Sequence, residues 1–261
     1  MGFFRLLAVY LKVGVLSELE YRVNFYIQLL RSAIGLTTGL AGLSIVFGHT
    51  DTLWGWRQPE LLALLGVYFL GSGLIGLVIQ PSMQRFMEDV RQGTLDFVLT
   101  KPEDSQVLVS VRQVQIWKVV DLLLGVVVIG IALVQLGEAV GFWQAVSFVV
   151  ALLSGATIIY AFWLMLATLS FWFVKIENIL VIFQSMYQAG RWPVGIYPLW
   201  LRSTLTFVVP VAFATTVPAE ALAGRLTPET LAGSVALAAV LLVVSRRVWS
   251  IGVRQYAGAS A

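Results

Sequence analysis

The sequence contains no cysteine and only one histidine, His49. Without cysteine the chain can form no disulfide bond, thiolate metal site or iron–sulfur cluster, and it has no cysteine nucleophile. A single histidine also excludes haem and zinc sites that need several histidine ligands. We therefore expect no metal site in this chain.

Charge is scarce as well. Charged residues make up 12% of the 261 residues and hydrophobic residues 59%, whereas about 25% of the residues in soluble domains are charged. With a mean hydropathy of +0.87, the composition is that of an integral membrane protein. Because one helical crossing takes about 20 residues, the chain has room for roughly six or seven crossings and for no separate catalytic domain. We expect one transmembrane domain over residues 1–261.

The apolar runs predict an all-α membrane protein with six transmembrane helices. An N-terminal helix over residues 3–20 carries Arg5, Lys12 and Glu20 on one side, which predicts that it lies at the membrane interface. The third span is short and reaches the membrane interface only if Trp117, Lys118 and Asp121 are included at one end. Asp121 is therefore an interfacial or packed carboxylate. The fourth is one span plus an extension, with a possible bend at 154–155. The expected spans are residues 24–48, 61–80, 122–137, 139–174, a fifth beginning at 178, and 230–249.

The region before the last span is broken by proline. Four of the eight prolines lie there, and they interrupt regular helix repeatedly at membrane depth. Such backbone is stable in a membrane only where protein or a water-lined cavity covers it. We therefore expect a re-entrant element between the fifth and sixth spans. Its prolines are Pro193, Pro198, Pro210 and Pro218.

The basic residues predict which side of the membrane each end faces. With both termini on the same side, that side receives 13 of the 17 lysines and arginines. Cytoplasmic loops carry such an excess, so we expect both termini in the cytoplasm. The same residues are scattered between apolar segments and form no patch, which argues against nucleic acid as a partner.

Two other motifs are weak. Residues 71–76 match G-x-G-x-x-G, but this motif binds dinucleotides only after a strand, and here it lies inside a span. With Gly35 and Gly39 it is better interpreted as small-residue helix packing.

The sequence has no G-x-x-x-x-G-K-[ST] motif for binding ATP phosphates, so ATP-driven work requires a partner. His49 beside Asp51 allows an intramembrane hydrolase as an alternative, although a solvated loop histidine is the simpler interpretation.

The most informative segment is the loop over residues 81–113. Apolar residues recur there at helical spacing, which predicts a short amphipathic helix that Gly93 ends as a C-cap. A short apolar piece over 95–99 follows, and Lys101 and Pro102 then break the chain. An exposed pair of this kind suits docking to a cytoplasmic protein; the alternative is a helix lying flat on the inner leaflet. The apolar positions are Met83, Phe86, Met87 and Val90, and the polar ones Arg85, Glu88, Asp89 and Arg91.

At these residues the sequence resembles the permease subunits of ABC exporters of the type-two ABC permease class. Residues 91–102 are similar to that class's R-x-G-x-L-D-x-x-L-x-x-P loop after the second span. A second match is the Y-P … F-x-x-P-x-A-F … P pattern. It is carried by Tyr197, Pro198, Phe207, Pro210, Phe213 and Pro218.

The resemblance implies a half-transporter in the bacterial plasma (inner) membrane. It would dimerise with itself or with a sister permease, rest on two cytoplasmic ABC ATPase subunits and contact membrane lipid. It would have no cofactor and no enzymatic activity of its own, since ATP and Mg belong to the partner ATPase subunits. The first inner loop would be the coupling helix, and the N-terminal helix the elbow. The implied coupling residues are Met87, Glu88, Arg91, Gly93, Leu95, Asp96, Lys101 and Pro102.

The broken outer segment would line or close the substrate exit, with Arg191, Trp192, Tyr197 and Arg202 as candidate residues. Interfacial anchoring explains such residues equally well. The substrate stays open: few charges lie at bilayer depth, which favours a lipid, amphiphilic drug, peptide or polysaccharide over a small multivalent ion. An ion-coupled secondary carrier is the alternative transporter, because discontinuous helices also mark that class.

Overall fold

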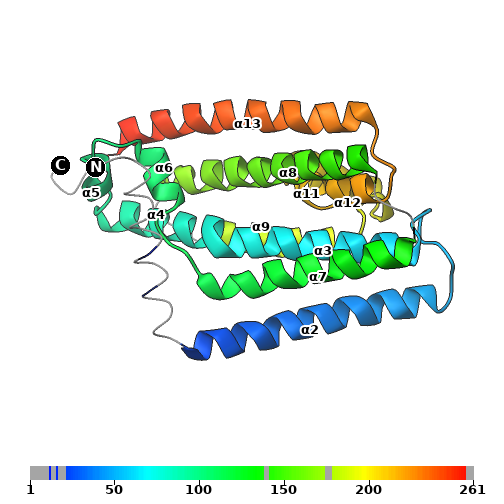
Figure 1. The fold of residues 1–261 in the computed structure, drawn as a ribbon. Coiled ribbons are helices and arrows are strands. Elements are labelled where there is room, and N and C mark those ends of the chain that lie inside the picture. Colours follow the sequence, from blue (N-terminus) through cyan, green and yellow to red (C-terminus); the bar gives the residue numbers. More distant parts are fainter. Residues whose placement is uncertain (1–11, 13–15, 17–21, 138–140, 174–177, 257–261) are drawn as a thin grey trace.

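The computed structural model describes residues 12, 16, 22–137, 141–173 and 178–256, and its regular elements are helices (Figure 1). Most of the predicted interfacial helix over 3–20 lies outside the described residues. The long helices run roughly alongside one another, and we name the two ends of the bundle by the elements found at each. The α4 end holds α4 (Gln80–Gln92), the start of α2 and the end of α13. The opposite end holds the connections 48–57 and 188–227.

Five helices are long and apolar enough to cross a membrane. They confirm the predicted first, second, third, fourth and sixth spans. Helix α3 packs along α7 and α8 packs along α13, while α2 makes fewer contacts, to α3 and α7. The helices are α2 (Arg22–Phe47), α3 (Gln58–Leu74), α7 (Val119–Leu136), α8 (Phe142–Thr168) and α13 (Pro228–Gln255).

The second span does not end where the sequence suggested. Helix α3 continues through a π-helical segment, η1 (Ile75–Ile79), into α4, giving one helix of 35 residues. Pro81 has no amide hydrogen and so leaves the Leu77 carbonyl without its helical donor. The backbone N–H of Gln115 donates to that carbonyl at 2.8 Å instead. The predicted amphipathic helix is therefore present as α4, but the predicted end of the span at residue 80 was wrong, because the amphipathic helix continues the span without a break. Its termination at Gly93, in the left-handed region at φ 71°, is confirmed.

Helices α3 and α7 approach each other closely at two glycines, Gly66 and Gly125. A Cβ on Gly66 would lie 2.9 Å from the backbone nitrogen of Ile129 and 3.0 Å from the carbonyl oxygen of Gly125. Only glycine allows two helix backbones this close, the packing that small residues give in membranes.

Helix α8 is a single helix through the position of the predicted bend. Gly155 instead lets α11 approach: a Cβ there would lie 2.9 Å from the Cα of Ala214. The last span begins as expected, since Thr227 is the N-cap of α13 and accepts a hydrogen bond from the Thr230 amide at 3.3 Å.

The chain between α8 and α13 consists of short helices, as the prolines predicted. Helix α9, with ten residues, is too short to cross a membrane by itself. Residues Leu199–Val208 and Val211–Leu222 are bent by 69° at Pro210 and form either one broken span or a re-entrant loop. The segments are α9 (Asn178–Tyr187), η4 (Gln188–Arg191), η5 (Val194–Ile196), α10 (Leu199–Ser203), η6 (Thr204–Val208), α11 (Val211–Ala214) and α12 (Thr216–Leu222).

Candidate functional site

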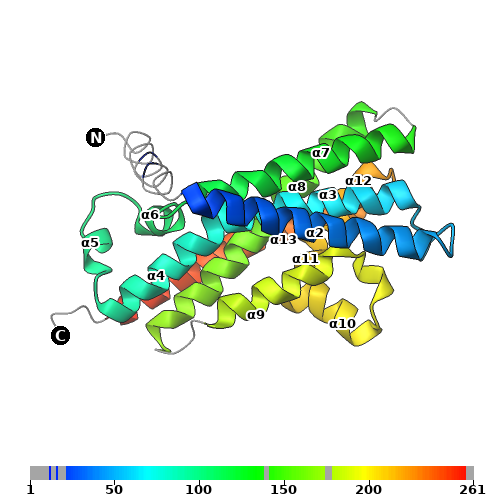
Figure 2. The same cartoon turned by 90° about the horizontal axis from the view of Figure 1, so that it is seen from below.

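The connection between α4 and α7 projects from the α4 end of the bundle (Figure 2). It contains α5 (Asp96–Leu99), α6 (Ser105–Ser110) and η2 (Ile116–Lys118). Leu95 and Val98 face inward and are buried, whereas the Phe97 side chain between them is 72% exposed. We define the tip as the exposed residues Phe97, Thr100 and Pro102 of this connection together with the exposed Arg91 and Gln92 at the end of α4.

Asp89 fastens this connection to α4. Its carboxylate is fully buried and pairs with Arg112, from the far end of the connection, and with the Arg85 Nε at 3.2 Å. The Thr94 hydroxyl donates to the same carboxylate at 3.1 Å, and the Thr94 amide donates to the Asp89 carbonyl at 2.9 Å. Both ends of the connection are thus held at one residue of α4.

A second ion pair fastens the connection to the last span. The two terminal nitrogens of Arg246, on α13, donate to the two oxygens of Asp104 at 2.8 and 2.6 Å. Arg246 lowers the pKa of Asp104 below its ordinary value of 3.8 by this hydrogen bond, against a weaker opposing effect of burial. Asp104 also caps α6 by accepting from the Gln106 amide at 2.9 Å, and the Ser110 hydroxyl bonds the Tyr160 hydroxyl of α8 at 2.8 Å. The tip is therefore linked to three spanning helices.

A polar cavity of about 240 Å³ lies between α2, α3, α7 and the α9–η4 segment. Asp121 on its wall is 4% exposed. It accepts hydrogen bonds from Ser32 and, at 3.0 Å, from Gln28, and it pairs with the Lys118 Nζ at 3.4 Å. Asp121 is thus a packed carboxylate, one of the two predicted possibilities. A second polar cavity of about 290 Å³ shares Gln28, Arg31 and Lys118 with the first.

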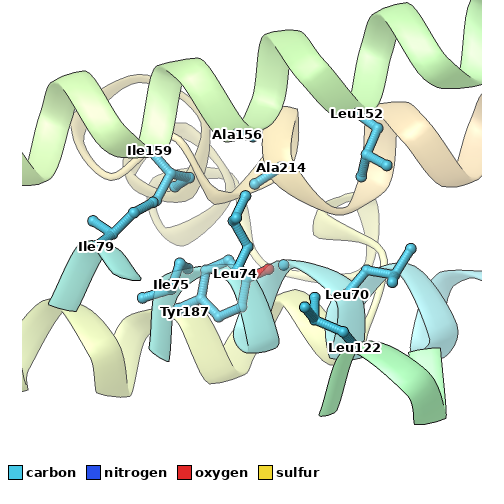
Figure 3. A pocket seen from close by; sticks show the side chains of 11 residues that line it. Leu70, Leu74, Ile75, Ile79, Leu122, Leu152, Ala156, Ile159, Tyr187 and Ala214 are labelled. Atoms are coloured by element: carbon cyan, nitrogen blue, oxygen red, sulfur yellow. The ribbon is translucent and has the colours of Figure 1, made fainter. Parts of the chain in front are cut away.

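An apolar cavity of about 140 Å³ lies between α3, α7 and α8 (Figure 3). Leu70, Leu74, Leu152 and Ile159 are among the aliphatic side chains that line it, and Tyr187 is the polar exception. Tyr187 also lines the polar cavity, so one side chain belongs to the walls of both.

The comparisons with known proteins agree with this arrangement. The model of the ABC-2 family transporter protein matches residues 33–260. The chain belongs to the ABC-2 transporter family. Neither the curated proteins nor the solved structures gave a match. Together with its long apolar helices, the family makes the chain a multi-pass membrane protein of a transporter family, and the resemblance seen in the sequence is confirmed.

The predicted coupling residues of this ABC-2 family member occupy different environments. Glu88 and Arg91 form an ion pair on the outer side of α4, and Pro102 is exposed. Gly93 makes the turn that redirects the chain, while Asp96 and Lys101 are half-buried. Met87 and Leu95 are buried and pack inside the protein. The apolar stripe of the amphipathic helix therefore faces the bundle: Phe86 packs edge-on against Phe171, of η3 (Leu169–Phe171), with centroids 5.4 Å apart.

Sequence reasoning missed three features of this region. Phe97 was counted only as part of an apolar piece, yet its side chain is the large apolar one at the tip. Arg112 and Arg246 were counted only as positive charges on one side of the membrane. The helical i, i+3, i+4 spacing of Leu95, Val98 and Leu99 is the sequence signal for the first, because it leaves Phe97 off the apolar face. The two ion pairs join residues distant in sequence, and no local pattern reveals them.

The structure does not gather the four candidate gate residues of this family member. A Cβ on Gly35, midway along α2, would lie 3.9 Å from an Arg191 terminal nitrogen, and the Arg191 guanidinium lies 5.0 Å from the Tyr68 ring centroid. Trp192 packs against Gly42 of α2. The Tyr197 hydroxyl donates to the Ala189 carbonyl at 2.9 Å, and Arg202 is exposed. Arg191 and Trp192 thus face α2, and Arg191 lies at mid-helix depth.

The opposite end is closed by a further ion-pair cluster. Glu60 is 1% exposed and accepts from Arg225 at 2.6 Å and from the Arg57 Nε at 3.1 Å. Arg225 also donates to the Gly55 carbonyl at 2.6 Å and lies 5.2 Å from the Trp56 ring centroid. This joins the connection between α2 and α3 to the one before α13.

His49 lies at the end of α2 and is exposed, with Nδ1 2.8 Å from the Ile45 carbonyl oxygen. Bonding to the carbonyl four residues earlier is the behaviour of a helix-end residue. Within the described part of the chain, no group of three or more His, Cys, Asp or Glu side chains could hold a metal ion.

Proposed function

We propose that this chain is the transmembrane subunit of an ATP-driven ABC export complex. It forms the substrate path as a dimer, with itself or with a sister permease, and is coupled to separate cytoplasmic ATPase subunits. The observation that carries the proposal is the tip: an exposed aromatic side chain, Phe97, on a segment that two ion-pair clusters fasten to the spans.

A segment that transmits force needs a contact surface and a stiff attachment. Interfaces concentrate binding energy in a few aromatic and arginine side chains, and the exposed Phe97 and Arg91 of the tip supply these groups. Asp89 and Asp104 supply the attachment to α4 and α13. When the ATPase subunits close on ATP, movement of the tip is passed to the helices that line the substrate path.

The charge pattern supports the orientation. The α4 end carries the excess of lysine and arginine, so it faces the cytoplasm, and both termini lie on that side of a bacterial plasma membrane. ATP and Mg bind to the ATPase partners, and this chain needs no cofactor. Residues 1–261 act as one permease domain.

The test is affinity purification of the chain from its native membrane, with co-purifying chains identified and ATP hydrolysis measured. The key variant is Phe97→Ala, and Phe142→Ala is the matched control because Phe142 is 74% exposed at the opposite end. We expect a stoichiometric ATP-hydrolysing partner. Loss of a hot-spot aromatic side chain costs about 2 kcal/mol or more of binding free energy. The affinity of the ATPase partner for this chain should therefore fall about 30-fold in Phe97→Ala and stay unchanged in Phe142→Ala.

Two results would contradict the proposal. A chain that purifies alone and shows no nucleotide-dependent activity in liposomes would favour the ion-coupled secondary carrier. Complete loss of activity in His49→Ala, with the fold intact, would favour the intramembrane hydrolase, because His49 has no role in a permease.

A further inference from the structure

Charged side chains from four segments line the polar cavity. Arg31 of α2, Lys118 of η2 and Arg191 of η4 are cationic, and Asp121 of α7 is the carboxylate among the lining residues. Arg191 lies near Gly35, which is about 20 Å along α2 from its start at 1.5 Å per residue. The cavity therefore reaches the middle of the bundle, where charge is costly and usually functional.

The single carboxylate does not neutralise the three cations. Asp121 is occupied by Lys118, Gln28 and Ser32. Among the described residues, no carboxylate pairs with Arg31 or Arg191. The buried Nε of Arg191 has no hydrogen-bond acceptor in the part of the chain that the structure describes, and the guanidinium lies 5.0 Å from the Tyr68 ring centroid. Arg31 is exposed and Arg191 is half-buried. Three cationic side chains around one occupied carboxylate leave the cavity positively charged, so an anionic ligand would complete this site.

Tyr187 indicates what else the ligand carries. Its side chain is 4% exposed, stacks on Tyr68 with ring centroids 5.4 Å apart, and has a buried hydroxyl with no hydrogen-bond partner. It lines both the polar cavity and the aliphatic cavity of Figure 3. The polar cavity, with its three cationic side chains, and the apolar cavity share the Tyr187 wall. Such a pair of cavities matches a molecule with an anionic head group and an apolar chain.

We propose that the polar cavity binds the anionic head group, a phosphate or carboxylate, of an amphiphile whose apolar part packs along the Tyr187 wall. Arg31 and Arg191 contact the head group, and the Tyr187 hydroxyl donates to it. That this amphiphile is also the exported substrate rests on the proposed export function. Under that function, the transported substrates are anionic amphiphiles. As a statement about binding the proposal is independent of the ATPase partner.

The test is native mass spectrometry of the purified full-length chain titrated with anionic phosphatidylglycerol, with zwitterionic phosphatidylcholine, which has no net charge, as the comparison. The key variants are Arg191→Gln and Arg31→Gln. Arg202→Gln is the matched control, because Arg202 is exposed and does not line the cavity. We expect phosphatidylglycerol to bind at least ten times more tightly than phosphatidylcholine, a preference lost in both cavity variants and kept in Arg202→Gln.

Asp121→Asn separates electrostatics from misfolding. It removes the negative charge and keeps one of the two oxygen acceptors that Ser32 and Gln28 use, so phosphatidylglycerol should bind more tightly than to the unaltered chain. Equal binding of the two lipids, or an unchanged preference in Arg191→Gln with melting temperature unaffected, would overturn the site. Displacement of phosphatidylglycerol by millimolar inorganic phosphate would refute an amphiphile as the ligand and would show that the site binds a free anion. Because no step uses ATP, failure here is distinguishable from absence of an ATPase partner.

Discussion

Asp104 and Arg246, separated by 142 positions in the sequence, form a bidentate ion pair between the start of α6 and the last span. Parallel hydrogen bonds of this kind fix orientation as well as distance. Arg246 donates in addition to the Gln106 side chain at 3.0 Å. The pair therefore sets the angle at which the tip leaves the bundle.

This pair predicts a stability difference that depends on pH. The pKa of Asp104 is lowered in the folded protein, so its contribution is present above the unfolded value and is lost as the pH falls through the folded value. Asp104→Asn keeps an N-cap side chain for α6 and removes the charge together with one of the two oxygens that accept from Arg246. Because the side chains of Asp104 and Arg246 are 38% and 51% exposed, we expect a loss of about 0.2–1 kcal/mol at pH 7.

Thermal unfolding in detergent of the unaltered chain and of Asp104→Asn, between pH 7 and pH 3, measures this difference. The two curves should converge below about pH 3.8, the ordinary pKa of the carboxyl group. A difference that persists unchanged at pH 3 would show that the pair does not act through its charge.

Asp89 predicts a much larger effect one turn before the tip. Asp89→Ala leaves Arg112 without its partner and the Thr94 hydroxyl without its acceptor. Removing one member of a buried ion pair costs about 3–5 kcal/mol. Glu88→Ala is the control, because the adjacent Glu88 is partly exposed and should cost about 1 kcal/mol or less. Chemical denaturation measures both, and equal losses would contradict the assigned role of Asp89.

The contact between α3 and α7 predicts a steric effect. Gly66→Ala places a methyl group 2.9 Å from the Ile129 backbone nitrogen, so the helices must separate, at a cost of about 1–3 kcal/mol. Gly130→Ala is the control: Gly130 is an exposed residue of α7 with nothing within 4 Å of its added Cβ, so this change should be neutral or slightly stabilising through higher helix propensity. Melting temperatures that change equally in the two variants would refute the close packing.

The cluster around Glu60 predicts an effect confined to the opposite end. Glu60→Gln weakens the bonds to Arg57 and Arg225 that join two connections. Since Arg225 is partly exposed, we expect a loss of about 1–3 kcal/mol, less than for a fully buried pair. Hydrogen exchange should quicken in residues 48–57 and 224–227 and not in 93–115. Glu229→Gln, exposed in the first turn of α13, is the control that should leave both unchanged.

The spans were predictable because lipid imposes long uninterrupted apolar helices. The sequence also identified the region of the tip, since the polar loop interrupts that pattern, and the proline-broken region before α13. It failed at Pro81, where a proline that normally marks a helix end lies inside a continuous helix. The Gln115 amide, 38 residues beyond the Leu77 carbonyl, replaces the missing bond, and no local pattern contains that information.

The polar cavity was not predictable for the same reason. Each of its charges lies in a different segment, and along the sequence Arg31, Lys118 and Arg191 are isolated residues beside apolar runs. Only the folded arrangement brings them to one chamber. Charges that look sparse in the sequence can therefore be concentrated in space.

The 35-residue helix from Gln58 to Gln92 has a mechanical consequence. At 1.5 Å per residue it is about 52 Å long, well beyond the roughly 30 Å of the hydrocarbon layer. Under the proposed function it would act as a lever about the glycine contact with α7, and a tilt of about 5° would displace one end relative to the other by about 4–5 Å at this length. Glu60 lies at one end and Asp89 at the other, so in that proposal a push on the tip would reach the opposite end of the protein through one continuous helix that includes the π-helical segment η1.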